Sequence, residues 1–186
     1  FQVVNDQPRS GFLAYNVMPL GARLKEVSPE VEEYCNFYPS YSGALVEYGD
    51  KKELMHKILK SEGNFFSFFP FEFIRTNAKV ALKEKNNAAI SEETAQKLFG
   101  DEDPVGKSIK VGETHCVVGG VYKISGKSSV EPAIVIREEF EENIKKNAEN
   151  WGSHTAFLVV KLKNPANKET VEKQIRQIYV DKQATK

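Results

Sequence analysis

The sequence lacks several features that would narrow its function at once. None of its apolar runs approaches the roughly 20 residues that a helix needs to cross a bilayer. Its 26 basic and 26 acidic residues leave no net charge, which argues against attraction of the whole chain to nucleic acid or to an anionic membrane. With 2 cysteines among 186 residues, the chain has no disulfide framework of the kind that stabilises small secreted proteins.

The two cysteines are Cys35 and Cys116. We expect Cys35 near the end of a helix and Cys116 in a strand, and we favour two buried thiols over a bridge between them. The bridged alternative stays open, because spacing along the sequence does not decide it.

Two Gly-Lys-Ser strings, at residues 106–108 and 126–128, raise the question of a phosphate-binding loop. The Walker A loop needs a glycine five positions before the glycine of that string. Asp101 and Val121 stand there instead. A strand rather than a helix is also expected after Lys107, so we interpret these strings as turn glycines beside a solvated lysine. ATP hydrolysis is therefore expected to belong to another polypeptide.

Other signals for catalysis are equally weak. His56, His115 and His154 lack the spacing of metal ligands, and no nucleophile motif of the Gly-x-Ser-x-Gly type is found. The carboxylate pairs 138–139 and 141–142 are expected on the solvated face of a helix. We therefore assign no catalytic, cofactor-binding or metal-binding residue and predict that the protein is not an enzyme.

The most informative stretch runs over residues 88–121. It predicts a strand ending near Ile90, then a helix with Ser91 as its N-cap and Glu92 and Glu93 in its first turn. Gly100 is expected to end that helix in the left-handed conformation. A strand with alternating apolar residues, a hairpin at residues 112–113 and a return strand follow.

The rest of the chain mixes helical and strand patterns, which favours an α+β fold. Pro19 is placed to start a helix that ends near Val27, with a turn following through Glu33. The segment at residues 51–60 has helical spacing but is interpreted as a strand that follows a hairpin at Gly49. Further elements are expected as a loop at 123–131, strands at 133–136 and 156–162, and helices at 137–150 and 168–179.

Aromatic side chains are concentrated between residues 64 and 73. Each buried Phe contributes about 1.5–3 kcal/mol to folding, so we favour a core position for this cluster. The alternative is an exposed surface for a partner protein or a membrane. The residues that would form such an interaction surface are Phe65, Phe66, Phe68 and Phe69.

The run LFGDEDPVGKSIKVG, followed by VVGGVYK, resembles the signature of the MacB-like periplasmic core domain of FtsX/MacB-type ABC transporter permeases. Weaker matches lie at residues 19–34 and 64–82. Gly119, which stands before Gly120, departs from the single glycine usual in the family. The residues that carry the match are Leu98, Phe99, Gly100, Asp101, Pro104, Gly106, Lys107, Ile109, Val117, Val118, Gly120 and Val121.

This resemblance implies an α+β fold with two lobes. A porter-like α/β lobe would be built from residues 1–48 and 130–186, and a mainly-β lobe, residues 49–129, would be inserted between them. The resemblance also implies membrane helices beyond both ends of the sequence, as part of a permease in the bacterial inner membrane. The present domain would then lie on the periplasmic side.

In that family the domain is mechanical and binds no cofactor. The implied partners are a cytoplasmic ATP-binding subunit or domain, reached through the membrane helices, and a periplasmic or outer-membrane protein. Nucleic acid is not among the expected partners. The alternative function is a free-standing secreted or periplasmic module that binds peptide or glycan.

Overall fold

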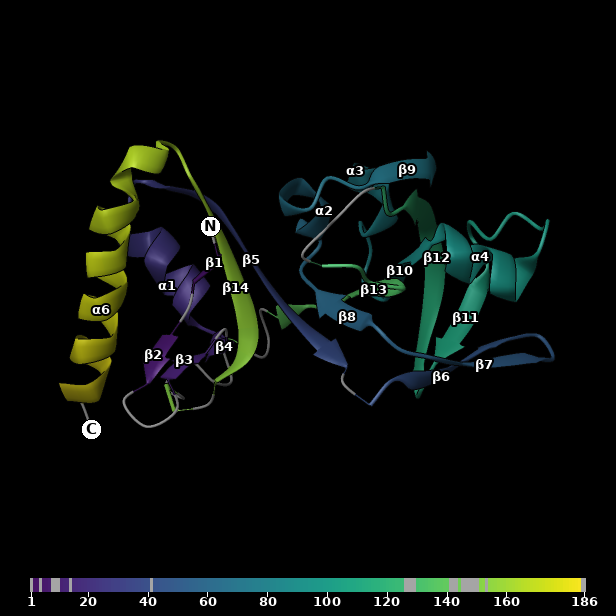
Figure 1. Ribbon diagram of the computed structural model, residues 1–186, viewed down its shortest axis with the longest axis horizontal. Coiled ribbons are helices and arrows are strands. Elements are labelled where there is room, and N and C mark those ends of the chain that lie inside the picture. Colours follow the sequence, from purple (N-terminus) through teal and green to yellow (C-terminus); the bar gives the residue numbers. More distant parts are fainter. Residues whose placement is uncertain are drawn as a thin grey trace. The chain divides into compact units, whose positions relative to one another are not determined.

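The computed structural model describes residues 2–3, 5–7, 11–13, 15–40, 42–125, 130–140, 144, 151–152 and 154–184 (Figure 1). The chain forms two compact units. Unit 1 combines Phe1–Phe37 with Phe140–Lys186, and unit 2 is Tyr38–Glu139. The lobe boundaries expected from the sequence, at 48–49 and 129–130, stay a prediction.

Unit 1 is built around the strand β14 (His154–Leu162). This strand pairs antiparallel with β1, β4 and β5, so segments from both halves of unit 1 share one sheet. A 3-10 turn, η1 (Pro165–Asn167), leads into its last helix. The other elements of the unit are β1 (Gln2–Val3), β2 (Asn5–Gln7), β3 (Gly11–Leu13), β4 (Tyr15–Val17), α1 (Leu20–Val27), β5 (Val31–Ser40) and α6 (Lys168–Ala184).

The core of unit 1 lies between its sheet and the helices α1 and α6. The apolar spacing expected for the last helix is confirmed, because Val171, Ile175 and Ile178 are all buried. Helix α1 approaches β5 closely at Gly21, where a Cβ atom would lie 2.5 Å from Cδ2 of Tyr34. A small residue is therefore required at this position for α1 to reach the sheet.

One prediction for unit 1 was wrong. The sequence indicated a turn as far as Glu33 and placed Cys35 near the end of a helix, but β5 begins at Val31 and Cys35 lies inside it. Helix α1 does end at Val27, as expected, and the chain then turns through Ser28. Pairing with β14 aligns Cys35 with Val159, and this long-range contact overrides the weak local signal around Pro29.

Unit 2 contains a mixed sheet in the order β8-β13-β10-β12-β11-β6-β7, with β9 paired to β12. β10 and β12 are parallel, as are β8 and β13, whereas the run from β12 through β11 and β6 to β7 is antiparallel. Its elements are β6 (Ala44–Tyr48), β7 (Lys51–Met55), β8 (Ile58–Ser61), α2 (Phe65–Phe68), β9 (Glu72–Arg75), α3 (Ala78–Ala81), β10 (Asn87–Ser91), α4 (Glu92–Phe99), β11 (Ser108–Val111), β12 (Thr114–Lys123) and β13 (Ile134–Arg137). The mixture of helices with parallel and antiparallel strands confirms the α+β class.

The stretch at residues 88–121 folds as the sequence predicts. Ser91 caps α4, and its hydroxyl accepts a hydrogen bond from the Thr94 amide at 3.2 Å. Gly100 ends the helix as expected, but its φ of +63° is combined with a ψ of −122°, which lies outside the left-handed helical conformation that the sequence indicated. Gly112 has φ +58° in the turn between β11 and β12. Helix α4 covers the inner face of this sheet, where Leu98 and Phe99 join the core of unit 2.

The segment at residues 51–60 is extended, as predicted. It forms β7 and β8, with a break at Lys57, whose φ is +58°. Because β7 pairs with β6 and β8 pairs with β13, the sheet decides between the helical and strand patterns of this sequence.

Two further expectations lie partly outside the described residues. The loop expected at 123–131 includes residues 126–129, and the helix expected at 137–150 includes most of the residues after Phe140. Both cysteines are buried thiols that are not joined in a disulfide, as favoured from the sequence. Within the described ranges, no helix is both long enough and apolar enough to cross a membrane.

Candidate functional site

The phenylalanines expected to offer an interaction surface do not share one environment. Phe65 and Phe66, in α2, are buried, with 0% and 4% of their surface exposed. Phe68 and Phe69 are half-buried. Phe69 stacks on Phe65 with 4.6 Å between the ring centroids. Phe65 and Phe66 therefore belong to the core, and an interaction surface in this segment depends on Phe68 and Phe69.

Tyr122 of β12 lies at the centre of this aromatic cluster. Its ring is fully buried and stacks on Phe71, with 5.2 Å between centroids. Phe66 lies 5.3 Å from the same ring and 4.8 Å, edge-on, from Phe73. The Tyr122 hydroxyl donates a hydrogen bond to the carbonyl of Pro132 at 2.7 Å, and burial raises the pKa of the phenol. Such a satisfied and protonated phenol stabilises the core.

The first Gly-Lys-Ser string forms a turn whose polar groups are already engaged. The ammonium of Lys107 lies 2.7 Å from a carboxylate oxygen of Glu102. The amide of Gly106 donates to the carbonyl of Val118 at 2.8 Å, and β11 begins at Ser108. These contacts agree with the expected turn, since a phosphate loop needs free amides at the start of a helix. The second string includes residues outside the described part of the chain.

The carboxylates at 138 and 139 were expected on a helix, and this prediction was wrong. Glu138 and Glu139 follow β13 and belong to no helix or strand. Glu138 accepts a hydrogen bond from the Tyr38 hydroxyl at 3.2 Å and pairs with Lys60 at 2.9 Å. Burial and the neighbouring carboxylate of Glu138 raise the pKa of Tyr38. The structure therefore assigns Glu138 to an ion pair within unit 2.

Ligands for a metal are not brought together in the part of the chain that the structure describes. No group of three or more His, Cys, Asp or Glu residues there could hold an ion. His56 and His115 are exposed. Burial raises the pKa of the Cys116 thiol to about 11, which leaves it protonated and a poor nucleophile at neutral pH.

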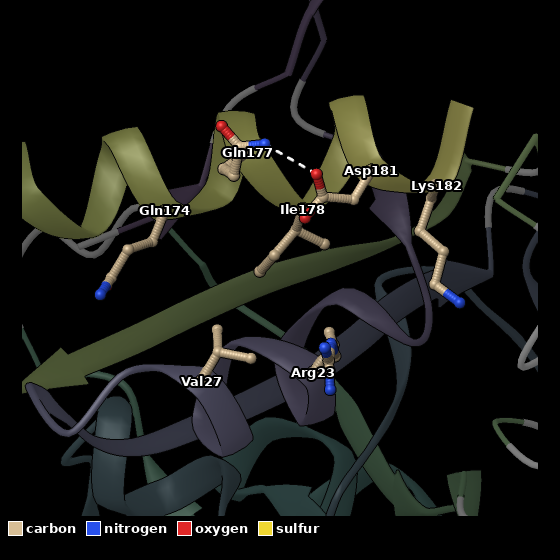
Figure 2. Close-up of a pocket in the computed structure, with 7 residues that line it drawn as sticks. All are labelled: Arg23, Val27, Gln174, Gln177, Ile178, Asp181 and Lys182. Carbon is tan, nitrogen blue, oxygen red and sulfur yellow. Dashed lines mark hydrogen bonds between the residues drawn. The ribbon is translucent and has the colours of Figure 1, made fainter. Parts of the chain in front are cut away.

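A groove of about 210 Å³ lies in unit 1, between α1 and α6 (Figure 2). Val27 of α1 and Ile178 of α6 face each other across it, and polar side chains from α6 form its rim. Val27 is 38% exposed although it continues the apolar stripe of α1. The residues that line the groove are Arg23, Val27, Gln174, Gln177, Ile178, Asp181 and Lys182.

The rim of this groove is engaged in local contacts. The guanidinium of Arg23 lies 2.9 Å from the carboxylate of Glu26, and Gln177 donates to Asp181 at 2.7 Å. The ammonium of Lys182 lies 5.7 Å from the centre of the Trp151 ring. The lining residues include no Ser, Thr, Cys or His, and the charged side chains at the rim are held in the local contacts just given, so we assign no catalytic role to this groove.

Sequence reasoning did not identify this groove. Val27 falls on the apolar side of its helix in the sequence, and only the structure shows that it is exposed. Contact between α1 and α6 joins residues far apart in the chain, so local periodicity does not place them together.

The family model of the MacB-like periplasmic core domain matches residues 2–178. The chain belongs to this family. The resemblance seen in residues 98–121 is thereby confirmed over nearly the whole of this chain. Among curated proteins, none matches its sequence.

Solved structures show the same fold. A domain described as part of a permease protein from Porphyromonas gingivalis has a TM-score of 0.74 at 21% identity, over 90% of this chain and 77% of that chain. The periplasmic region of MacB from Actinobacillus actinomycetemcomitans has a TM-score of 0.66 at 15% identity, over 95% and 80% of the two chains. The extracellular domain of the ABC-type transporter YknZ from Gram-positive bacteria has a TM-score of 0.63 at 16% identity, over 92% and 86%.

Proposed function

We propose that this MacB-like domain is the extracytoplasmic part of an ABC transporter permease in the bacterial inner membrane. Its work there is to relay conformational change from the membrane helices to a substrate or to a partner protein outside the membrane. Membership of the family supports this proposal, as do the descriptions of its structural neighbours as parts of a permease and of transporters.

The observation that carries the proposal is the composition of unit 1. Segments from both ends of the sequence meet in it. β1 pairs with β14, with Val3 opposite Leu158, and α6 packs against α1 through buried residues such as Ile175. A displacement applied to either end of the domain therefore enters the same packed body. Packed cores have low compressibility, so a displacement at one end of unit 1 moves the unit as a whole and deforms it little.

The path from unit 1 to unit 2 runs through the chain itself. The chain passes between the units after Phe37 and after Glu139. The first crossing lies within β5, a strand that spans Val31–Ser40. A continuous strand resists bending better than a loop does, which favours transmission of movement through this crossing.

The energy for this movement would come from a separate ATP-binding subunit or domain on the cytoplasmic side. The engaged turn at Gly106 and Lys107 supports that division of labour, because its amides and its ammonium are occupied by contacts within the chain. The contacts of Glu138 with Tyr38 and Lys60 likewise favour a structural role.

Pulsed electron paramagnetic resonance on the full-length permease with its ATP-binding partner tests the proposal. One nitroxide is attached at Glu113→Cys in unit 2, whose side chain is 99% exposed, and the other at the outer end of a membrane helix. Both cysteines of the 186-residue chain are buried, and any cysteine in the rest of the permease or in its ATP-binding partner is replaced before labelling. Trapping the ATP-bound state is expected to shift the distance distribution of this pair.

A matched pair of labels within unit 2, at Glu113→Cys and Lys79→Cys, is expected to keep its distance distribution in both states. If ATP trapping leaves the distance from unit 2 to the membrane unchanged, the relay is refuted. If the distance distribution of the pair within unit 2 shifts by as much, unit 2 deforms and does not move as a rigid body.

A further inference from the structure

The strand β7 forms the free border of the sheet in unit 2 (Figure 1). It pairs with β6 on one side. Within the described residues, the backbone of Lys51–Met55 pairs with β6 and makes no backbone–backbone hydrogen bond to another segment. Amide and carbonyl groups along such an edge are a template for one more strand.

One face of this edge carries a row of alternating charges. Lys110 of β11 stands opposite Glu47 of β6, and Glu47 stands opposite Lys52 of β7. The Lys52 ammonium lies 2.8 Å from Glu47, and the Lys110 ammonium lies 3.8 Å from it. The charges across the three strands therefore alternate as positive, negative and positive, and the last of them, Lys52, lies on the edge strand. Opposite charges directly across strands stabilise their pairing, so a carboxylate is the favoured next neighbour.

The same face carries exposed aliphatic side chains beside that row. Leu54 of β7 stands opposite Leu45 of β6, and their surfaces are 65% and 42% exposed. The opposite face of the same strands is covered, since Val46 and Met55 are buried in the core. Leu54 is a large aliphatic residue that is mostly exposed on an edge strand. Such a side chain gains from burial against an apolar residue of a binding partner.

We propose that β7 is a docking edge for an extended segment of a partner protein, which adds as an antiparallel strand. The segment carries a carboxylate opposite Lys52 and an aliphatic residue opposite Leu54. In the partner these residues are two positions apart, with the aliphatic one first, because the added strand runs opposite to β7. This proposal does not depend on the relay proposed above.

A second copy of this chain fits the edge less well. Two copies of β7 keep their outer faces together only in antiparallel registers centred on a residue. Centring on Lys52 or on Glu53 sets like charges against each other, and centring on Leu54 sets Lys52 opposite His56. None of these registers offers Lys52 a carboxylate. Centring on Lys51 brings Asp50, from the turn before the strand, opposite Lys52, but it also sets Lys51 against Lys51. Lysine at an edge opposes such self-association, and it admits an acidic strand.

The other lysine at this edge is already engaged. The Lys51 ammonium donates to the carbonyl of Leu98, at the end of α4, at 2.9 Å. Lys51 therefore turns toward the covered side of the sheet. Lys52, whose side chain is 60% exposed, is therefore the charged residue of β7 that lies opposite an added strand on the outer face.

Titration of the isotope-labelled 186-residue chain with short blocked peptides, followed by amide chemical shifts, tests this proposal. The probe contains Leu-Thr-Glu flanked by threonines, and a matched probe carries Lys in place of Glu. We expect shifts concentrated in β7 and β6, with at least tenfold weaker binding of the Lys probe. A third probe, N-methylated at alternate backbone positions, is expected not to bind, since it lacks the donors that extend a sheet.

Charge exchange in the protein completes the test. The Lys52→Glu variant is expected to bind the Lys probe and no longer the Glu probe. The control variant Lys79→Glu, changed on exposed α3, is expected to prefer the Glu probe as the parent does. Lys52→Gln serves as a second variant if the acidic one disturbs the fold, and it is expected to bind both probes alike. Binding that is indifferent to Lys52, or to N-methylation, overturns the proposal. Concentration-dependent β7 shifts without peptide would assign the edge to a second copy and overturn it as well.

Discussion

The carbonyl oxygen of Ala81, at the end of α3, lies so close to Gly119 of β12 that a Cβ atom at position 119 would overlap it. The same Cβ would lie 2.9 Å from the carbonyl carbon of Ala81. At Gly120, a Cβ would lie 2.6 Å from Oγ1 of Thr76. Because Gly119 and Gly120 have no side chains, α3 and the residues just before it pack directly against the backbone of β12. This explains the additional glycine at 119 by contact with backbone, which cannot rotate aside.

We expect Gly119→Ala to lower the free energy of unfolding by about 3 kcal/mol, the upper part of the usual range for overpacking. Denaturant unfolding followed by circular dichroism measures this change. Val117→Ala, on the same strand at a 46% exposed position, is the control, with an expected change within about 0.5 kcal/mol. Equal stabilities for Gly119→Ala and the parent would show that α3 does not need this close approach.

Gly100 tests a different role of glycine, because no atom within 4 Å would meet a Cβ there. Its φ of +63° with ψ of −122° is a combination that costs other residues about 1–3 kcal/mol. We expect Gly100→Ala and Gly100→Asn to destabilise the protein alike, since Asn tolerates the left-handed helical conformation but not this ψ. Recovery of parental stability by Asn in thermal unfolding would contradict this account.

The cap of α4 is linked to the chain before β13. Ser91 donates to the Thr94 hydroxyl at 3.0 Å, and that hydroxyl donates to the carbonyl of Ala133 at 3.2 Å. We expect Ser91→Ala to cost about 0.5–2 kcal/mol, as for other lost caps. Ser91→Asp is expected to retain most of the stability, because its carboxylate also accepts from the Thr94 amide. Chemical denaturation of both variants at pH 7 distinguishes loss of the cap from loss of volume.

The buried thiol of Cys116 predicts a dependence of stability on alkaline pH. Its pKa is raised from 9.0 to about 11 in the folded protein by burial. Above pH 9 the unfolded chain loses this proton first, so the stabilisation is complete below pH 9 and is lost as the pH rises through 11. The expected loss is about 2 kcal/mol.

Replacement of this thiol isolates its effect from other groups that titrate in the same range. In denaturant unfolding between pH 7 and 11, Cys116→Ala is expected to lose stability with rising pH less steeply than the parent. Ile109→Val, at the position paired with Cys116, removes buried volume without a titrating group and is expected to keep the parental slope. A parental slope in Cys116→Ala would show that the thiol does not titrate differently on folding.

The sequence predicted correctly those elements that are determined by residues close together in the chain. The Ser91 cap, the Gly100 stop and the hairpin at Gly112 were found because side-chain capping and positive φ are local properties. The burial of Val171, Ile175 and Ile178 was predicted for the same reason, since helical spacing alone places them on one face.

The errors arose where distant contacts decide the structure. Cys35 was assigned to the wrong element, because pairing with Val159 outweighs the local pattern. Glu138 was expected on a solvated face, although it forms an ion pair with Lys60 and accepts a hydrogen bond from Tyr38. In the aromatic segment, composition indicated burial of the cluster but not that Phe65 and Phe66 lie deeper than Phe68 and Phe69.

The amino-acid sequence by itself determined the family, the α+β class and the hairpin-rich middle of this protein, because turn glycines and helix caps act over short distances. Only the tertiary structure decided which faces are open. The α1–α6 groove and the Lys110–Glu47–Lys52 row both join residues far apart in the chain. Strand register and helix packing create such surfaces, and these depend on which segments meet after folding.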